Sequence, residues 1–417
     1  MQSSGTTVPR ALILDHTARE GGAETALARL LNALPGAEDR VRVLLFEDGP
    51  LHRRLHASGV QTAVVELDAS VNTAARSDIA GLGAIRAAWT AVRFVPRLVR
   101  AIRGADPEIV VANSLKSAVF TAVAAPLAGR RWAWHLHDRL AADYLPRTLV
   151  ALMRGIALCG PTRIVVNSEA TRATLPHRAQ KRCVVAYPGL DDDSFTDQPP
   201  VRVDPPTIGM VGRISPTKGQ KEFIRAAALV ARDRPDTRFV VIGDALFGED
   251  GYRQEAHDLA AALGVDDRID FTGWVDDAPT RMSRMSVVVH ASPVPEPFGQ
   301  VIVEAMARGV PVVATATGGV SEILQSRTTP VIGWQRTTLG IVVTPADHQA
   351  LAGAITDVLS DPEAAEERAA AARRAAEAFR ISSTAQRVIG AWSFRLPRSG
   401  TIRYFENARL TGREEAS

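Results

Sequence analysis

The chain has 417 residues, of which 46% are hydrophobic and 23% charged, and its formal net charge is +3. This composition is that of an ordinary globular protein, and the length predicts two domains. The small, dispersed charge gives no reason to expect nucleic acid. Two cysteines are too few for a disulfide framework and fit a reducing cytoplasm. With no predicted signal peptide and no apolar run of about 20 residues, we expect a cytoplasmic or at most peripheral protein.

Short apolar runs alternate with helical patterns along the first half of the chain. Strands are predicted at 11–15, 41–46, 62–66, 108–112, 132–135 and 164–167, with helices between them at 23–34, 115–127 and 147–158. This β-α-β alternation predicts a parallel, doubly wound sheet. Four prolines in DQPPVRVDPP make 197–206 the predicted linker, so the first domain is expected at 1–196.

The second half repeats this architecture. Strands are predicted at 207–211, 239–242, 269–271, 287–290 and 310–314, and helices at 221–232, 252–263, 346–359 and 363–379. We expect a second domain at 207–380 and a C-terminal helix and tail, 381–417, that returns to the first domain. Ligands of open α/β sheets bind beyond the carboxyl ends of the strands. Two facing domains of this kind predict an enzyme with an interdomain cleft.

The segment EPFGQVIVEAMARGVPVVATATGGVSE, residues 296–322, carries two carboxylates eight positions apart, Glu296 and Glu304. A Phe-Gly turn and the start of an apolar helix separate them. Amides at a helix start attract anions and hydroxyl oxygens, and carboxylates accept hydrogen bonds from sugar hydroxyls. The layout suits a ligand that is part sugar and part phosphate.

A second polar segment follows the predicted strand 207–211. Arg213 and Lys218 lie five residues apart between Gly212 and a predicted helix start at Gly219. A guanidinium and an ammonium group beside a helix N-terminus suit a diphosphate. Taken alone, the same residues are equally consistent with a solvated basic turn.

Together these motifs resemble the E-x7-E signature of retaining GT-B-fold glycosyltransferases of the group-4 family, the glycosyl transferases group 1. Further matches are VGRISPTKG (211–219), FTGWV (271–275), YPGLD (187–191) and GGAE (21–24), so the resemblance spans about residues 10–390. It implies two facing Rossmann-like domains and transfer of a sugar from a nucleotide-diphosphate donor to a hydroxyl acceptor. That acceptor would be a glycan, a lipid-linked glycan or a small molecule. The resemblance implies no cofactor and no metal.

The resemblance also assigns roles to individual residues. Arg213 and Lys218 would hold the donor pyrophosphate in place of a metal, Glu304 the ribose, and Glu296 the donor sugar. The other implied donor contacts are Gly21 and Gly22 in the first domain, Gly212, the base-binding turn Trp274 and Val275, and the backbone amides of Phe298, Gly299, Gln300 and Val301. The family often has Leu or Met where this chain has Gln300.

The segment WAWHLHD, residues 132–138, ends a predicted strand with two histidines and an aspartate. Three interpretations compete: a metal site, core or turn histidines, and a histidine that contacts the sugar. By the resemblance, His137 fits the sugar contact and would be catalytic, whereas His135 would lie inside the strand. Asp191–Asp193 resembles a D-x-D metal motif, but its place at the predicted hinge disfavours metal.

Residues 82–103 interleave arginines with apolar residues. Such a helix either packs on the core or lies on an anionic membrane, and Pro96 is expected to interrupt it. The two rival functions for the whole chain are a nucleotide-sugar epimerase or hydrolase and a non-catalytic nucleotide-sugar-binding protein.

Overall fold

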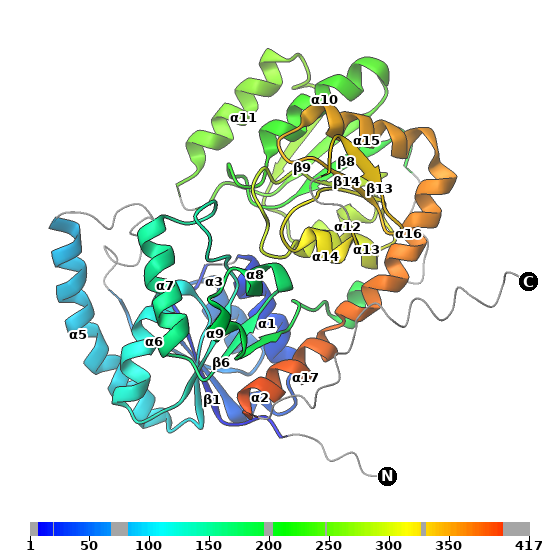
Figure 1. Cartoon of the computed structure of the whole chain (residues 1–417). Helices are drawn as coiled ribbons and strands as arrows, with labels where there is room; N and C mark the ends of the chain where they lie inside the picture. Colours follow the sequence, from blue (N-terminus) through cyan, green and yellow to red (C-terminus); the bar gives the residue numbers. More distant parts are fainter. Residues whose placement is uncertain are drawn as a thin grey trace, which may run out of the picture. The chain divides into compact units, whose positions relative to one another are not determined.

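The computed structural model describes residues 7–19, 21–67, 82–195, 203–246, 248–326 and 331–394. The chain forms two compact units, the first ending at Gly189 and resuming at Arg380, and the second spanning Leu190–Phe379 (Figure 1). The Leu190 amide donates to the Phe379 carbonyl over 2.9 Å, so the segments entering and leaving the second unit lie side by side. The first unit thus ends before residue 196. Residues 197–202 of the predicted linker lie outside the described residues.

The first unit contains a seven-stranded parallel sheet in the order β3-β2-β1-β4-β5-β6-β7. Its strands are β1 (Ala11–Asp15), β2 (Val41–Leu45), β3 (Gln61–Val64), β4 (Ile109–Ala112), β5 (Trp132–Leu136), β6 (Arg163–Val166) and β7 (Cys183–Val185). The first six match the predicted strands. The seventh strand was not predicted, because three residues are too few to show an alternating hydrophobic pattern.

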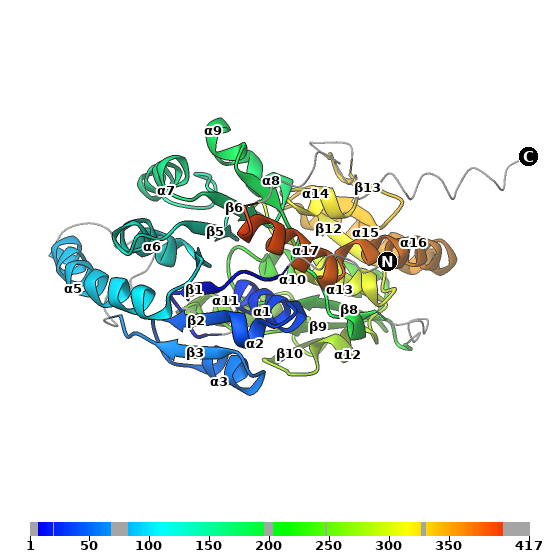
Figure 2. The same ribbon diagram turned by 90° about the horizontal axis from the view of Figure 1, so that it is seen from below.

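Helices cover both faces of this sheet (Figure 2). One apolar core lies under α1 (Gly22–Ala33), α2 (Ala37–Arg40), α3 (Pro50–Ala57) and α17 (Ile381–Trp392). The other core lies mainly under α5 (Leu82–Ala105), α6 (Leu115–Leu127), α7 (Arg147–Cys159) and α9 (His177–Gln180). The remaining helix of this unit, α8, spans Glu169–Ala173. The prediction that Pro96 interrupts its helix is wrong, since α5 continues through it. Phe94, Leu98 and Ile102 are buried on either side of Pro96 and hold the helix on the sheet.

Helix α17 belongs to the first unit although it follows the second unit in sequence. Val388 and Trp392 are buried in the core beneath α1. The Thr384 hydroxyl donates to the Tyr187 carbonyl over 2.7 Å, and Arg387 donates to the Val185 carbonyl over 3.0 Å. These contacts fasten α17 to the segment that leaves β7.

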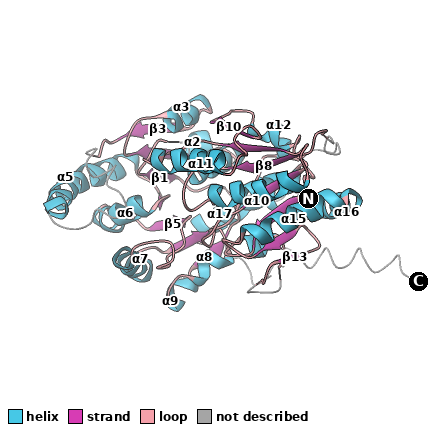
Figure 3. Ribbon diagram, turned by 90° about the horizontal axis from the view of Figure 1, so that it is seen from above, coloured by secondary structure: helices cyan, strands magenta, loops and turns pink. Residues whose placement is uncertain are grey.

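The second unit contains another sheet, whose strands appear in magenta in Figure 3. It has seven strands in the order β10-β9-β8-β11-β12-β14-β13. Its strands are β8 (Thr207–Val211), β9 (Arg238–Ile242), β10 (Ile269–Gly273), β11 (Val287–His290), β12 (Val312–Thr315), β13 (Trp334–Arg336) and β14 (Ile341–Val343). Strand β13 pairs antiparallel with β14, and the other strand pairs described for this sheet are parallel. The strands β13 and β14 were not predicted, because each has three residues and β13 is exposed throughout.

The helices of the second unit alternate with its strands, which confirms the prediction of two doubly wound α/β domains. They are α10 (Gln220–Asp233), α11 (Asp250–Ala262), α12 (Ala278–Met282), α13 (Gln300–Ala307), α14 (Val320–Ile323), α15 (His348–Ser360) and α16 (Pro362–Ala376), with short 3-10 turns at Asp192–Ser194 and Glu377–Phe379. Within the part of the chain that the structure describes, no helix has the length and apolar character needed to cross a bilayer.

Candidate active site

In the second unit, the loop that carries Glu296 is fixed by the glycine pair in front of α14. The Gly319 amide donates to the Glu296 carbonyl over 3.0 Å. A Cβ on Gly318 would lie 2.1 Å from that carbonyl oxygen, and Gly318 has a positive φ of 63°. Only glycine combines this conformation with such close approach. The G-G motif therefore holds the Glu296 loop in place.

The Glu296 side chain forms an ion pair with Lys218. Both carboxylate oxygens lie 2.8 Å from Lys218 Nζ, and the Glu296 side chain is 15% exposed. His290, at the end of β11, places Nε2 3.5 Å from Glu296 Oε2. Burial opposes ionisation, but Lys218 and His290 outweigh it and hold the Glu296 pKa well below its usual value. The carboxylate therefore stays charged and ready to accept hydrogen bonds.

The loop that carries Lys218 is fastened to the end of β11. Gly219 has a φ of 84°, and a Cβ there would lie 2.0 Å from the Ala291 carbonyl oxygen. The Ser292 hydroxyl donates to the Thr217 carbonyl. Buried Gln220 donates to the Arg213 carbonyl over 3.0 Å. These contacts fix the loop from Arg213 to Gly219 beside the Glu296 loop.

The remaining predicted residues of this unit follow β8 or β10, or lie at α13. Gly212 follows β8, and a Cβ on Gly243 would lie 2.2 Å from the Gly212 carbonyl oxygen. Trp274 is 56% exposed just after β10. Phe298 is buried, and Gly299, with a φ of 109°, is the N-cap of α13. Gln300 and Val301 lie in the first turn of this helix. Three further predicted residues are half-buried: Arg213, Val275 and Glu304. His290 was not predicted, although its position at a strand end is where ligand-binding residues gather.

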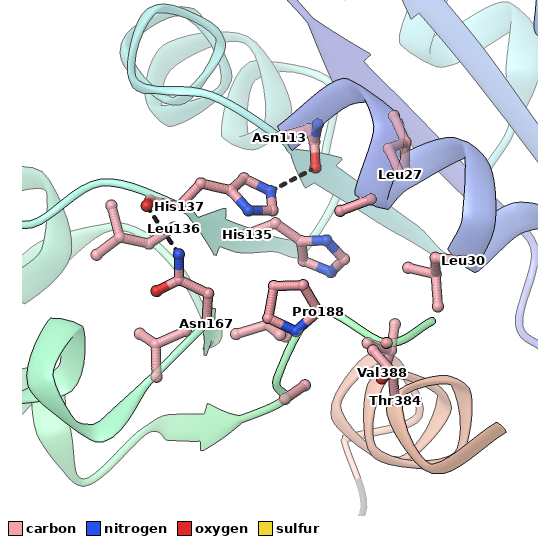
Figure 4. A pocket seen from close by; sticks show the side chains of 15 residues that line it. Leu27, Leu30, Asn113, His135, Leu136, His137, Asn167, Pro188, Thr384 and Val388 are labelled. Atoms are coloured by element: carbon pink, nitrogen blue, oxygen red, sulfur yellow. Dashed lines mark hydrogen bonds between the residues drawn. The ribbon is translucent and has the colours of Figure 1, made fainter. Parts of the chain in front are cut away.

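In the first unit, polar side chains gather at the carboxyl ends of β1, β4 and β5. Asn113 Nδ2 donates to Asp15 Oδ2 over 2.6 Å. Asn113 Oδ1 lies 3.1 Å from His137 Nε2, as Figure 4 shows. Asp15 and Asn113 are almost fully buried. Neither was singled out from the sequence, although each ends or follows a predicted strand. Of the three, only His137 was predicted.

A second histidine shares this cluster. His16 Nδ1 lies 2.8 Å from Ser114 Oγ and 3.3 Å from Asp15 Oδ1, and the His16 amide donates to Asp15 Oδ1 over 2.7 Å. Burial would raise the Asp15 pKa, but hydrogen bonds from His16 and Asn113 and the nearby His16 ring lower it below its usual value. Asp15 is therefore an ionised, fully buried carboxylate.

The two histidines after Trp134 have different surroundings. His135 is buried, its Nε2 accepts a hydrogen bond from Trp392 Nε1 over 3.0 Å, and the two rings stack. Burial and the nearby His137 lower the His135 pKa to about 3, so its ring is neutral. His135 ties β5 to α17. Burial also lowers the His137 pKa, against the opposing charges of Asp138 and Asp15.

Among the described residues, no cluster of three or more His, Cys, Asp or Glu side chains is arranged to hold a metal ion. This applies to Asp138 and to Asp191–Asp193 as well. A small pocket instead adjoins His137, with Asn113, Asn167 and the apolar side chains of α1 and α17 in its lining (Figure 4). Asn167 Nδ2 donates to the His137 carbonyl over 2.9 Å.

The glycines of the GGAE segment begin α1, with Gly21 as its N-cap and Gly22 as its first residue. A Cβ on Gly21 would lie 2.5 Å from Glu24 Oε2, so this glycine makes room for the glutamate. The Glu24 side chain is buried. Burial, and next the charges of Asp15 and Asp138, raise the Glu24 pKa to about 8. At neutral pH, Glu24 is therefore a protonated carboxylic acid.

We expect Glu24→Gln to change how stability depends on pH. A carboxyl group with a raised folded pKa loses stabilisation as pH increases from its unfolded pKa of 4.5 to its folded pKa of about 8. Between pH 5.5 and 8, the wild-type free energy of unfolding should fall by about 3 kcal/mol more than that of Glu24→Gln. Urea denaturation at both pH values measures this difference. The exposed Glu38→Gln control should follow the wild type, and identical pH dependence in all three proteins would contradict the prediction.

Comparison with known proteins agrees with this geometry. The family model for glycosyl transferases group 1 matches residues 191–376, and that for glycosyltransferase family 4 matches residues 20–194. The chain is 26% identical over 369 residues to the 2-deoxystreptamine glucosyltransferase of Streptomyces kanamyceticus, covering 81% of this chain and 90% of the relative. It is 30% identical over 274 residues to a D-inositol 3-phosphate glycosyltransferase of Mycobacteroides abscessus, covering 60% of this chain and 57% of the relative. The crystal structure of Anabaena HepE with UDP and glucose matches with a TM-score of 0.77 and 28% identity, covering 92% of this chain and 99% of HepE.

Proposed function

Since this chain belongs to the glycosyl transferases group 1 family, we propose that it moves a hexose from a UDP-sugar to a hydroxyl acceptor. It is a retaining, nucleotide-sugar-dependent glycosyltransferase with the GT-B fold. The observation that carries the proposal is the ion pair between Lys218 and Glu296, which joins a phosphate-binding cation to a sugar-binding carboxylate. The choice of UDP and a hexose follows HepE, which binds UDP and glucose.

The donor's phosphates bind the loop between β8 and α10. Lys218 is half-buried next to the start of α10, where the helix N-terminus also favours an anion. Arg213 is held in the same loop by the Gln220 bond to its carbonyl. Both cations stabilise the negative charge that develops on the departing UDP. No metal is needed for this step, because the two cations supply the charge.

The sugar and nucleoside are held by the second loop and its neighbours. Glu296 accepts hydrogen bonds from the sugar hydroxyls, with the amides at Phe298, Gly299, Gln300 and Val301 beside it. Glu304, in the second turn of α13, accepts from the ribose, and the exposed Trp274 with Val275 contacts the base. In the first unit, His137 accepts a hydrogen bond from a sugar hydroxyl, and Gly21 and Gly22 allow the backbone to approach the donor phosphate.

Transfer proceeds with retention of configuration. As the sugar–phosphate bond breaks, the departing phosphate oxygen takes the proton of the acceptor hydroxyl on the same face of the sugar. The acceptor oxygen then bonds the anomeric carbon, and UDP leaves with the proton. Positioning and electrostatic stabilisation supply the catalysis, since no protein side chain is covalently changed.

A transfer assay tests this function directly. Purified enzyme, a panel of UDP- and GDP-hexoses and candidate hydroxyl acceptors are incubated with and without excess EDTA, and products are identified by mass spectrometry. We expect a UDP-hexose to give an acceptor-dependent glycoside with the anomeric configuration of the donor, at a rate that EDTA changes by less than about twofold. Activity that requires added manganese or magnesium would contradict the role of Arg213 and Lys218. Conversion of the donor without any acceptor would contradict transfer.

The enzyme also contacts the inner face of the membrane, where lipid-linked acceptors are found. No acidic residue occurs in α5, α6 or α7, and the described arginines of α5 include the exposed Arg93, Arg97 and Arg100. Leu127 and Leu152, on α6 and α7, are 57% and 52% exposed. Exposed basic and apolar side chains on helices of one layer favour an anionic lipid surface.

Vesicle sedimentation measures this contact. We expect the protein to bind phosphatidylglycerol vesicles at low salt and to bind phosphatidylcholine vesicles at least about tenfold more weakly. Arg97→Glu with Arg100→Glu should lower binding by about the same factor. Arg232→Glu, on an exposed arginine of the second unit, serves as the control and should bind like the wild type. Equal binding by the double variant and the wild type would contradict the proposal.

A further inference from the structure

Three buried or half-buried side chains in the first unit form a directed series of hydrogen bonds. Asp15, at the end of β1, contacts Asn113 after β4, and Asn113 contacts His137 after β5. The residues are 98 and 24 positions apart in sequence. The parallel sheet brings them together because the carboxyl ends of neighbouring strands share one edge.

The chemistry of Asp15 fixes the direction of this series. An ionised carboxylate only accepts hydrogen bonds, so the Asn113 atom 2.6 Å from Asp15 Oδ2 must be the amide nitrogen. The amide oxygen of Asn113 then faces His137 Nε2 at 3.1 Å. Because that oxygen cannot donate, His137 Nε2 must carry the proton.

The other ring nitrogen of His137 is therefore a bare acceptor. No hydrogen bond from a described residue reaches His137 Nδ1, and the side chain lines the pocket beside Asn167 (Figure 4). We propose that Asp15 and Asn113 are positioning residues that hold His137 as the Nε2–H tautomer and keep its Nδ1 lone pair for a hydroxyl of the donor sugar. This inference rests on the proposed contact between His137 and the sugar.

This series of hydrogen bonds predicts that His137 adopts the opposite tautomer in Asp15→Asn. The backbone amide of His16 donates to Asp15 Oδ1, so the oxygen of an asparagine at this position must stay there. Its NH₂ group would then face Asn113. Two NH₂ groups cannot share a hydrogen bond, so Asn113 would turn its oxygen towards residue 15 and its NH₂ towards His137 Nε2. The proton of His137 would move to Nδ1.

Nitrogen-15 NMR of the labelled full-length protein reads the tautomer directly. In the wild type we expect the unprotonated, pyridine-type signal on His137 Nδ1, and in Asp15→Asn on Nε2. The kcat should fall about tenfold in Asp15→Asn, while the donor KM stays within about twofold, because one hydrogen bond near the reacting sugar changes from acceptor to donor. Asn167→Ala is the matched control, because Asn167 donates to the backbone carbonyl of His137 and not to its ring. In this variant, the tautomer of His137 should be the same as in the wild type.

Two results would overturn the inference: a protonated Nδ1 in the wild type, or an unchanged tautomer in folded Asp15→Asn. Should Asp15→Asn not fold, Asn113→Ala takes its place. The His137 Nε2 proton should give a slowly exchanging resonance in the wild type that disappears in Asn113→Ala, and its persistence would equally overturn the inference. These spectra do not depend on enzyme turnover. A wrong assignment of the His137 tautomer can therefore be distinguished from a wrong assignment of the transferase function.

Discussion

Replacing Lys218 with alanine is expected to lower kcat/KM by about a thousandfold. The variant loses the cation that we propose stabilises the departing diphosphate, an effect of the size found for other charge-stabilising groups in active sites. It also leaves the Glu296 carboxylate, which is 15% exposed, without the ammonium group 2.8 Å away. Steady-state kinetics with the UDP-hexose measures the loss, and calorimetric titration with UDP should show weaker binding.

The matched control is Lys221→Ala, three residues further along. Lys221 pairs with Glu255, whose side chain is 62% exposed, and its Nζ lies 4.9 Å from the Tyr252 ring centroid. Such exposed pairs contribute little, so Lys221→Ala should retain activity within about twofold of the wild type. Turnover by Lys218→Ala close to that of Lys221→Ala, with both proteins folded by circular dichroism, would refute the assignment of the phosphate site.

The second large effect is expected for His137→Ala. We expect kcat to fall about a hundredfold, because the role proposed for His137 is a contact with the reacting sugar. UDP affinity should stay within about twofold, since the proposed nucleotide contacts are all made by other residues. Turnover assays and UDP titration separate the two quantities.

His135→Ala is the comparison that tests the register of this strand. Removing its ring leaves the buried Trp392 N–H without its acceptor, so the variant should lose about 1–3 kcal/mol of stability. Its turnover at low temperature should remain within about fivefold of the wild type. A folded His135→Ala without transfer activity, together with near wild-type turnover of His137→Ala, would show that the sugar contact lies two residues earlier.

The sequence determined the architecture and supplied most of the candidate site residues in the second unit. Alternating apolar runs and amphipathic helices dictate a doubly wound sheet, because parallel strands must be buried and crossed over by helices. Glu296, Glu304, Arg213 and Lys218 were identified because each belongs to a contiguous motif with a fixed spacing. The G-G pair could be recognised as a motif, but its purpose, the close approach to the Glu296 carbonyl, could not.

Tertiary structure alone decided which side chains meet. Lys218 and Glu296 are 78 positions apart, and they pair because the ends of β8 and β11 are neighbours in the sheet. His290, Asp15 and Asn113 were not singled out from the sequence, since each is a single polar residue at or just after the end of an apolar strand and carries no periodic signal. His137 was singled out only through the family resemblance. In each sheet, the strand order brings such residues to the carboxyl ends of neighbouring strands, and their surroundings then set their charge. Glu296 and Asp15 stay ionised because cationic or hydrogen-bond-donating groups face them and outweigh burial. Glu24, which is buried near the like charges of Asp15 and Asp138, holds its proton.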